Sequence, residues 1–186
     1  MKVKRSNEHY TYTDYASWPD DGNRYELING EAYMMSPAPT WEHQGISQEL
    51  SRQLGNFLQG KPCRVFSAPF DVRLNAATDD DVVVQPDIVV ICERSKLSGT
   101  GCIGAPDLVI EILSRSSASR DKVMKFYQYL QAGVREYWIV DPDSKTVTVN
   151  ILDNGRYYNT SYAETDTVTV QVLEGCKISL PDIFAE

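Results

Sequence analysis

VVVQPDIVVIC (residues 82–92) and DLVIEILS (residues 107–114) are the two stretches that decide the fold. Branched apolar residues dominate both, which is typical of strands that are buried on both faces. Each stretch nevertheless holds a central acid, Asp87 in the first and Glu111 in the second. A carboxylate buried without a partner is costly or is forced to take up a proton. We therefore expect the two acids to bind a divalent metal ion or, as the structural alternative, to be satisfied by arginine or backbone donors.

The rest of the chain predicts a mixed sheet with helices on its faces. An Asn-Gly pair between alternating residues predicts an N-terminal hairpin, and apolar residues at helical spacing predict two amphipathic helices. Pro69 indicates a bend or an edge position within its strand. The expected elements are a hairpin over 24–35, helices over 41–58 and 116–131, strands over 64–74, 82–92, 107–114 and 135–141, and an antiparallel meander over 145–173.

Length and composition favour a single globular domain over residues 1–186, with a frayed N-terminus over 1–12. No apolar run is long enough to cross a membrane and the N-terminus lacks an apolar signal segment, so we expect a cytoplasmic protein. The formal net charge of −8 argues against strong nonspecific binding of nucleic acid. Residues 115–125 are an exception, because they form a locally basic segment.

The four cysteines are Cys63, Cys92, Cys102 and Cys176. They are far apart and no CxxC pair occurs, so a zinc site is not expected. A disulfide framework is also not expected in a chain of this ordinary composition. We interpret all four as small buried or half-buried residues.

Pro86-Asp87 followed by Glu111 on the next strand resembles the PD-(D/E)xK nuclease motif, although Leu113 stands where that motif has lysine. The wider pattern is more specific. YELINGE, SAPFDVRL, VVQPDIVV, GAPDLVIEILS, DKVMKFYQY and GVREYWIVDP occur in the order found in the Uma2 family, a restriction-endonuclease-like group. The resemblance implies a restriction-endonuclease-like α/β fold in which Asp87 and Glu111 hold Mg²⁺, with Mn²⁺ as a substitute.

The resemblance also implies a new position for the missing lysine. Uma2-like sequences carry Asp, Lys and Tyr at intervals of four on the helix after the Glu strand, and here these are Asp121, Lys125 and Tyr129. Spacings of four place side chains on one helix face. Lys125 is therefore expected beside the carboxylates, with Lys122 as the alternative. The residue pattern alone is equally consistent with an exposed Asp121–Lys125 pair.

Glu31 is our candidate for a third acid, since it follows the hairpin turn within the YELINGE segment. A solvated hairpin glutamate is the alternative reading. Glu26 lies five residues earlier, and with regular pairing we expect it on the opposite strand face. His43 is expected to cap its helix or to lie at the edge of the site, and a catalytic role for it is not favoured.

The predicted function is therefore Mg²⁺-dependent hydrolysis of phosphodiester bonds, with Glu31, Asp87, Glu111 and Lys125 as catalytic residues. The expected partner is nucleic acid, foremost DNA, contacted by Arg115, Arg120 and Lys122. A homodimer is expected because many nucleases of this superfamily act as dimers. The competing function is a catalytically inactive nuclease scaffold that serves oligomerisation or partner binding. Convergence of the acids and Lys125 on one open cavity would distinguish the two.

Overall fold

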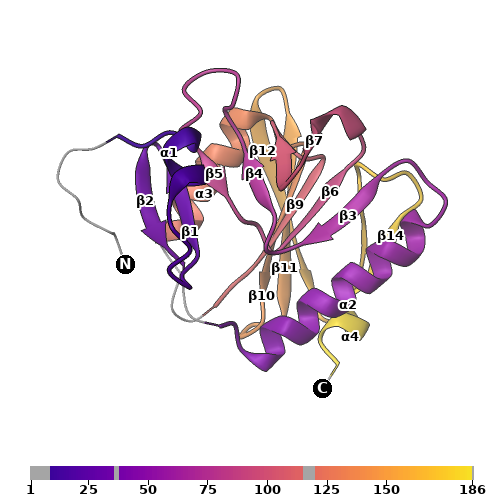
Figure 1. Cartoon of the computed structure of the whole chain (residues 1–186). Helices are drawn as coiled ribbons and strands as arrows, with labels where there is room; N and C mark the ends of the chain where they lie inside the picture. Colours follow the sequence, from indigo (N-terminus) through magenta and orange to yellow (C-terminus); the bar gives the residue numbers. More distant parts are fainter. Residues whose placement is uncertain (1–8, 36–37, 115–119, 186) are drawn as a thin grey trace.

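A computed structural model describes residues 9–35, 38–114 and 120–185. Figure 1 shows a central sheet crossed on one side by the long helix α2, with the β1–β2 hairpin standing on the other side. The chain forms an α/β structure of two six-stranded mixed sheets and a small two-stranded sheet, which confirms the predicted fold class.

The larger core is built on one six-stranded sheet, ordered β12-β11-β10-β9-β6-β3. Its strands are β3 (Arg64–Ser67), β6 (Ile88–Ile91), β9 (Leu108–Ile112), β10 (Glu136–Asp141), β11 (Thr146–Asp153) and β12 (Arg156–Ala163). Only the β9–β10 pair of this sheet is parallel. A parallel pair needs a crossover connection, and helix α3 (Arg120–Ala132) lies in that connection.

The second six-stranded sheet is ordered β2-β1-β5-β4-β8-β7. Its strands are β1 (Tyr25–Ile28), β2 (Glu31–Met34), β4 (Asp71–Arg73), β5 (Val83–Val84), β7 (Leu97–Ser98) and β8 (Gly101–Ile103). The predicted hairpin is confirmed, because β1 and β2 pair around Asn29 and Gly30. Both turn residues have positive φ, as a two-residue turn between twisted strands requires.

The remaining elements are short except for α2, which spans the predicted range of residues. They are α1 (Tyr12–Ser17), α2 (Trp41–Leu58), the 3-10 turn η1 (Arg94–Lys96), β13 (Thr167–Thr169), β14 (Lys177–Ser179) and α4 (Leu180–Ile183). The side chain of Thr40 caps α2 by accepting the N–H of His43. The prediction of a frayed N-terminus is wrong for residues 9–12, since Tyr10 bonds to Gly30 and α1 begins at Tyr12, while residues 1–8 lie outside the described chain.

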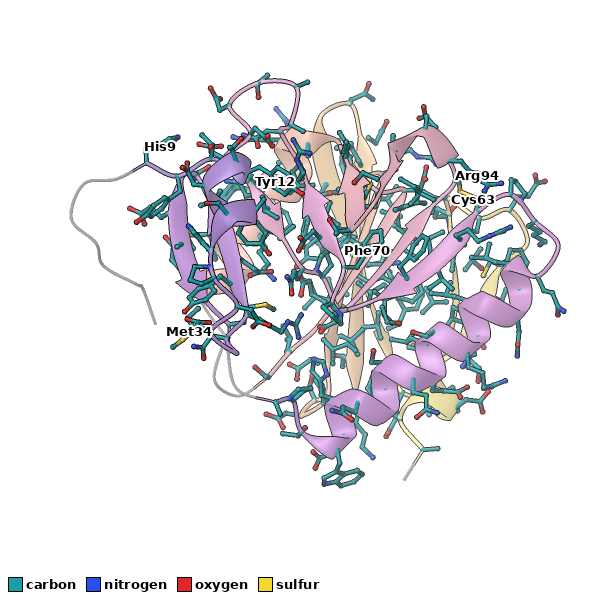
Figure 2. All side chains as sticks on the ribbon, in the orientation of Figure 1. His9, Tyr12, Met34, Cys63, Phe70 and Arg94 are labelled. Atoms are coloured by element: carbon teal, nitrogen blue, oxygen red, sulfur yellow. A yellow bond between two sulfur atoms is a disulfide. The ribbon has the colours of Figure 1, made fainter. Side chains whose placement is uncertain are left out.

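Strand alternation divides the core into two layers. Leu108, Ile110 and Ile112 of β9 face one layer, together with the apolar stripe of α2. Val109 faces the other layer, which lies between the two large sheets and beneath α3. Figure 2 shows side chains filling the space on both sides of the central sheet. Because Glu111 alternates with Ile110 and Ile112, its carboxylate is on the same side as Val109.

Two predicted strands are each divided by a proline. The 64–74 segment breaks at Pro69, as expected, into β3 of one sheet and β4 of the other. The 82–92 segment also breaks, at Gln85-Pro86-Asp87, so its prediction as a single strand was wrong. Proline cannot donate a ladder hydrogen bond, and here the chain passes from one sheet to the other. This passage places Asp87 at the junction of the sheets.

The predicted C-terminal meander is confirmed for its first two segments, β11 and β12, which pair with each other and, through β11, with the predicted strand β10. Its third segment is different, because β13 leaves the sheet and pairs with β14. Val168 and Ile178 face each other in that pair and are fully buried against the α2 layer. The alternation of residues had predicted that this segment would continue the meander. The burial of these apolar residues beside α2 instead favours the pairing of β13 with β14.

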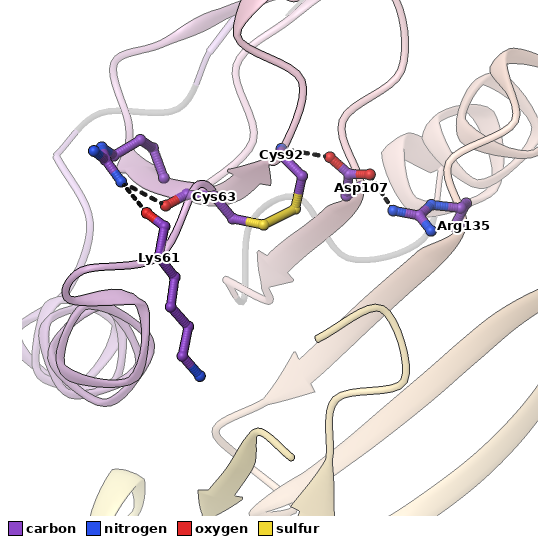
Figure 3. The surroundings of a disulfide bond; sticks show 6 residues. Lys61, Cys63, Cys92, Asp107 and Arg135 are labelled. Atoms are coloured by element: carbon purple, nitrogen blue, oxygen red, sulfur yellow. Dashed lines mark hydrogen bonds and ion pairs between the residues drawn. A yellow bond between two sulfur atoms is a disulfide. The ribbon is translucent and has the colours of Figure 1, made fainter. Parts of the chain in front are cut away.

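Cys63 and Cys92 form a disulfide, contrary to the expectation of four unpaired cysteines (Figure 3). The register of β3 and β6 places Arg64 opposite Ile91, so the two cysteines at the ends of these strands also meet. Register depends on tertiary packing, which cysteine spacing does not reveal. Cys102 and Cys176 are buried free thiols, as predicted.

Loss of this disulfide should lower stability. The bond closes a loop with a sequence separation of 29 residues, for which loop-closure entropy gives about 3–4 kcal/mol. We expect Cys63→Ser/Cys92→Ser to lower Tm by roughly 7–14 °C, measured by circular dichroism. Thiol titration of the denatured, unreduced wild type should detect Cys102 and Cys176 alone, and detection of all four thiols would contradict the pairing.

Within the described part of the chain, no helix is both long and apolar enough to cross a membrane.

Candidate active site

The two acids of the central strands meet at the junction between the sheets. Asp87 precedes β6, and its Oδ2 accepts the backbone N–H of Ile112 at 2.7 Å. Ile112 directly follows Glu111 in β9, so the hydrogen bond holds the Asp87 carboxylate beside the Glu111 segment. The neighbouring strands β6 and β9 thus bring together the acids that the sequence predicted as a pair.

Helix α3 supplies two donors to Glu111. Lys125 Nζ lies 3.0 Å from Glu111 Oε1, and the Tyr129 hydroxyl donates to the same oxygen at 2.6 Å. The two donors are four residues apart and therefore lie on one helix face. The expected approach of Lys125 to the carboxylates is present in the structure.

Glu26 is the third acid of this cluster. Its Oε1 lies 2.7 Å from Lys125 Nζ and also accepts the backbone N–H of Gln85 at 2.8 Å. Lys125 therefore bridges two carboxylates, one from β1 and one from β9. All three side chains are nearly buried, with exposures of 9% for Glu26, 14% for Glu111 and 11% for Lys125.

Glu31 does not occupy the position that we expected. It pairs with Ile28 across the hairpin, and its carboxylate accepts the Tyr33 hydroxyl at 2.7 Å. The expectation that Glu26 lies on the opposite strand face from Glu31 was wrong. The hairpin register pairs Glu26 with Tyr33 and Ile28 with Glu31, so these four residues lie on one face of the hairpin. Glu26 is further from the turn than Glu31. That displacement along the strand brings Glu26, rather than Glu31, to Lys125.

His43 lies in the first turn of α2 and reaches the same junction. Its Nε2 is 3.3 Å from Asp87 Oδ2, and 11% of its side chain is exposed. Burial alone would lower the pKa of His43, but the hydrogen bond and charge of Asp87 outweigh it, and the pKa is raised. Within the described residues, His43 Nδ1 is the one buried side-chain nitrogen or oxygen that has no hydrogen-bond partner.

The cluster holds more negative than positive charge. Burial raises the pKa of Glu111 to about 7; the charges of Asp87 and Glu26 add to this shift, and Lys125 opposes it. For Lys125, burial lowers the pKa, but the charges of Glu111 and Glu26 outweigh it and raise the pKa above its ordinary value. Lys125 is therefore charged at neutral pH. Burial and the Glu111 charge also raise the pKa of Tyr129, so its hydroxyl keeps its proton.

These groups open into one cleft with a volume of about 1540 Å³. Glu26, His43, Asp87, Glu111 and Lys125 all line it. Glu31 does not, whereas Leu113, at the position of the motif lysine, does. Residues from the hairpin, from the start of α2 and from the end of β10 complete the walls, and Met34 at the lower end of the hairpin in Figure 2 is one of them.

The cleft walls are rich in acids beyond the cluster. Glu42, Glu49, Asp141, Asp143 and Asp182 line it. Of the predicted nucleic-acid contacts, Arg115 lies outside the described residues. Arg120 and Lys122 belong to the first turn of α3, and their side chains are not described.

The roles of the two hairpin glutamates, Glu26 and Glu31, can be compared by mutation. We expect Glu26→Gln to reduce activity at least tenfold more than Glu31→Gln. The reason is that, of these two glutamates, Glu26 is the one that contacts Lys125 and lines the cleft. A factor of roughly tenfold corresponds to about 1.4 kcal/mol of lost transition-state stabilisation. The measurement is the initial rate, for each purified variant, of the phosphodiester cleavage that the sequence predicts. A larger loss in Glu31→Gln would restore the role first predicted for Glu31.

Sequence reasoning missed Glu26 and underestimated His43. The signal for Glu26 was present, because an acid between Tyr25 and Leu27 in a strand is as unusual as Asp87 or Glu111. The alternation of side chains along a single strand had placed Glu26 and Glu31 on opposite faces. The pairing of β1 with β2 across the turn places both on one face. His43 had no comparable signal, since only the packing of α2 brings it to Asp87.

The chain is similar in sequence and in fold to known proteins. A crystal structure titled "putative nuclease belonging to DUF820", from Anabaena variabilis ATCC 29413, is 25% identical with a TM-score of 0.75, covering 95% of this chain and 98% of its own. Two uncharacterised proteins of Synechocystis sp. PCC 6803 are also similar. One is 25% identical over 85% of this chain and 83% of its own length, and the other 28% identical over 76% and 80%.

The family model Uma2, described as "Putative restriction endonuclease", matches residues 12–181. That span contains the entire site, from Glu26 to Tyr129, and every strand of both large sheets. The chain belongs to the Uma2 family of restriction-endonuclease-like proteins.

Proposed function

We propose that this protein is a metal-dependent nuclease that hydrolyses phosphodiester bonds, foremost in DNA. The observation that carries the proposal is the convergence of Asp87, Glu111 and Lys125 on one open cleft. A scaffold with no selected chemistry has no need to collect two acids and a buried lysine from three separate elements. The family descriptions of nuclease activity support the same class of reaction.

A magnesium or manganese ion fits the chemistry of the donors. Among the described residues, no three His, Cys, Asp or Glu side chains are arranged to hold a metal ion by themselves. Mg²⁺ does not require such a cage, because it usually binds one or two carboxylates together with waters and substrate phosphates. The hydrogen bonds described for the Asp87 carboxylate fall on Oδ2 and those for the Glu111 carboxylate on Oε1, so both side chains would be able to hold the ion as well. When bound, the ion would offset the excess negative charge, activate water and neutralise phosphate.

Lys125 would act as a fixed cation. Its raised pKa means that it does not accept a proton at neutral pH, so we exclude it as a general base. An ammonium held at the cleft wall can instead stabilise the negative charge that develops on phosphoryl oxygens. Glu26 and Glu111 orient this ammonium from two sides, at 2.7 and 3.0 Å.

The neighbouring groups would position the acids. The Tyr129 hydroxyl donates to Glu111 and fixes one of its oxygens. Asp87 is held by the Ile112 backbone N–H and by His43. Such supporting contacts keep a catalytic constellation in register, which is worth orders of magnitude in rate.

The substrate would enter an acidic cleft. Arg24 and Lys145 line it, and we propose as further phosphate contacts Arg120 and Lys122, in the first turn of α3, and Arg115, which precedes that helix in the sequence. Because the net charge is −8, binding should be weak and should decrease steeply with salt. A second subunit that completes the groove would strengthen it, and a homodimer remains our prediction.

The test is cleavage of a panel of nucleic acids: supercoiled plasmid, linear duplex DNA, single-stranded DNA and RNA. We expect cleavage of at least one substrate with Mg²⁺ or Mn²⁺, and none in EDTA or with Asp87→Ala. Equal cleavage by wild type and Asp87→Ala would contradict the proposal. Absence of cleavage throughout the panel would favour the inactive scaffold.

A further inference from the structure

An exposed tryptophan at the start of α2 lines the cleft. Trp41 is the first residue of α2, lines the cleft and has 73% of its surface exposed. The other tryptophans differ, since Trp138 is fully buried and Trp18 packs among Tyr10, Tyr15 and Tyr25. A large aromatic surface exposed on the wall of this cleft is available to stack on a ligand that enters it.

Gly45 leaves the space above Trp41 open. It occupies the next turn of α2, also lines the cleft, and a Cβ added there would meet no atom within 4 Å. Helical side chains lean toward the preceding turn, so any larger residue at 45 would lie over the turn that carries Trp41. Glycine inside a helix is unfavourable relative to alanine, and the fold has no steric need for it here.

The charges of the cleft determine which part of a nucleotide would face this wall. Glu42 is exposed on the first turn of α2 and lines the same cleft, so its charge would repel phosphate from the helix surface beside Trp41. Two cations line other parts of the cleft: Arg24, which directly precedes β1, and Lys125 of α3. These cations would attract the phosphates away from α2. The group turned toward Trp41 is therefore an uncharged aromatic base.

We propose that Trp41, in the space left by Gly45, stacks on an unpaired nucleobase, so that the substrate is a single-stranded segment. A base inside a stacked duplex presents no free face to an indole ring, whereas an unpaired base does. This inference rests on the proposed nuclease function and specifies the substrate class of the same cleft.

Fluorescence anisotropy tests the proposal with a fluorescein-labelled DNA oligonucleotide, single-stranded or annealed to its complement, with Ca²⁺ replacing Mg²⁺ to prevent cleavage. We expect wild type to bind the single strand more tightly. Trp41→Ala should weaken that binding roughly 5- to 150-fold, the range for loss of one base–aromatic stack, and should change duplex binding less than about twofold. Tyr158→Ala, which removes an aromatic residue that is 60% exposed outside the cleft, should leave both unchanged.

Substitutions at Gly45 form a second set of variants, in which helix α2 is expected to stay folded. Gly45→Ala should raise Tm by about 1–4 °C with a small loss of single-strand binding. Gly45→Gln should keep the helix and lose more binding than Gly45→Ala. Equal binding of single strand and duplex, or full binding by Trp41→Ala or Gly45→Gln, would overturn the inference and leave the nuclease proposal standing. Failure of wild type to bind either DNA form would overturn the inference, and if the metal site were also absent the proposed function would fail with it.

Discussion

Replacing Lys125 with methionine should abolish cleavage and also destabilise the protein. Lys125 is the cation between Glu26 and Glu111, and its loss leaves two nearly buried carboxylates without compensation. Breaking a buried ion pair by removing one partner costs about 3–5 kcal/mol. Loss of the cation at the phosphate should reduce the rate by about 10³-fold or more. The affinity for Mn²⁺ should not weaken, because Lys125 is not a metal ligand.

Urea unfolding and single-turnover cleavage measure the two effects separately. Lys177→Met, at an exposed strand position, is the matched control and should behave as wild type. Adding Glu26→Gln to Lys125→Met should recover part of the stability without recovering activity, since it removes one of the two uncompensated charges. Wild-type rates in Lys125→Met would refute the role of Lys125 in place of the motif lysine.

Replacing Glu111 with glutamine should have opposite effects on activity and on stability. Activity should fall below detection, about 10³-fold or more, because the amide loses the charge that holds a cation. Stability of the metal-free protein should rise by roughly 1–3 kcal/mol at pH 8. The reason is that burial, Asp87 and Glu26 together hold the pKa of Glu111 near 7, above its ordinary value of 4.5, despite the opposing charge of Lys125.

The pH dependence gives the sign of this effect. A group with a raised pKa in the folded state contributes its stability fully below the unfolded pKa and loses it as pH rises through the folded pKa. Wild type without metal should therefore lose stability between about pH 4.5 and 7 relative to Glu111→Gln. Thermal melts of both proteins across this range make the comparison. A difference that is flat with pH would show that Glu111 ionises as an ordinary surface glutamate.

The fold was predictable where one local signal dominated. Asn29-Gly30 determined the hairpin, and the apolar stripe from Ile46 to Leu58 determined that this segment is helical. The acids Asp87 and Glu111 were conspicuous for a physical reason, because charge inside apolar strands requires a partner. Their meeting with Lys125 followed from the family pattern more than from the residues alone.

Features that depend on register or on packing between distant segments were not predictable. The division of the 82–92 strand depends on two sheets that have no signature in the sequence. The Cys63–Cys92 bond depends on the pairing of β3 with β6. The position of Glu26 was not predicted, because side chains alternate between faces within one strand but this alternation does not continue through a turn.

The central claim is that Asp87 and Glu111 form a divalent-metal site, and titration calorimetry with Mn²⁺ tests it most directly, without a choice of substrate. Wild type, Asp87→Ala and Glu111→Ala are compared, with the exposed Asp153→Ala as the matched control. We predict saturable binding to wild type and to the control, and its loss in both site variants. Equal binding to all four proteins would contradict the assignment of the metal to this pair of acids.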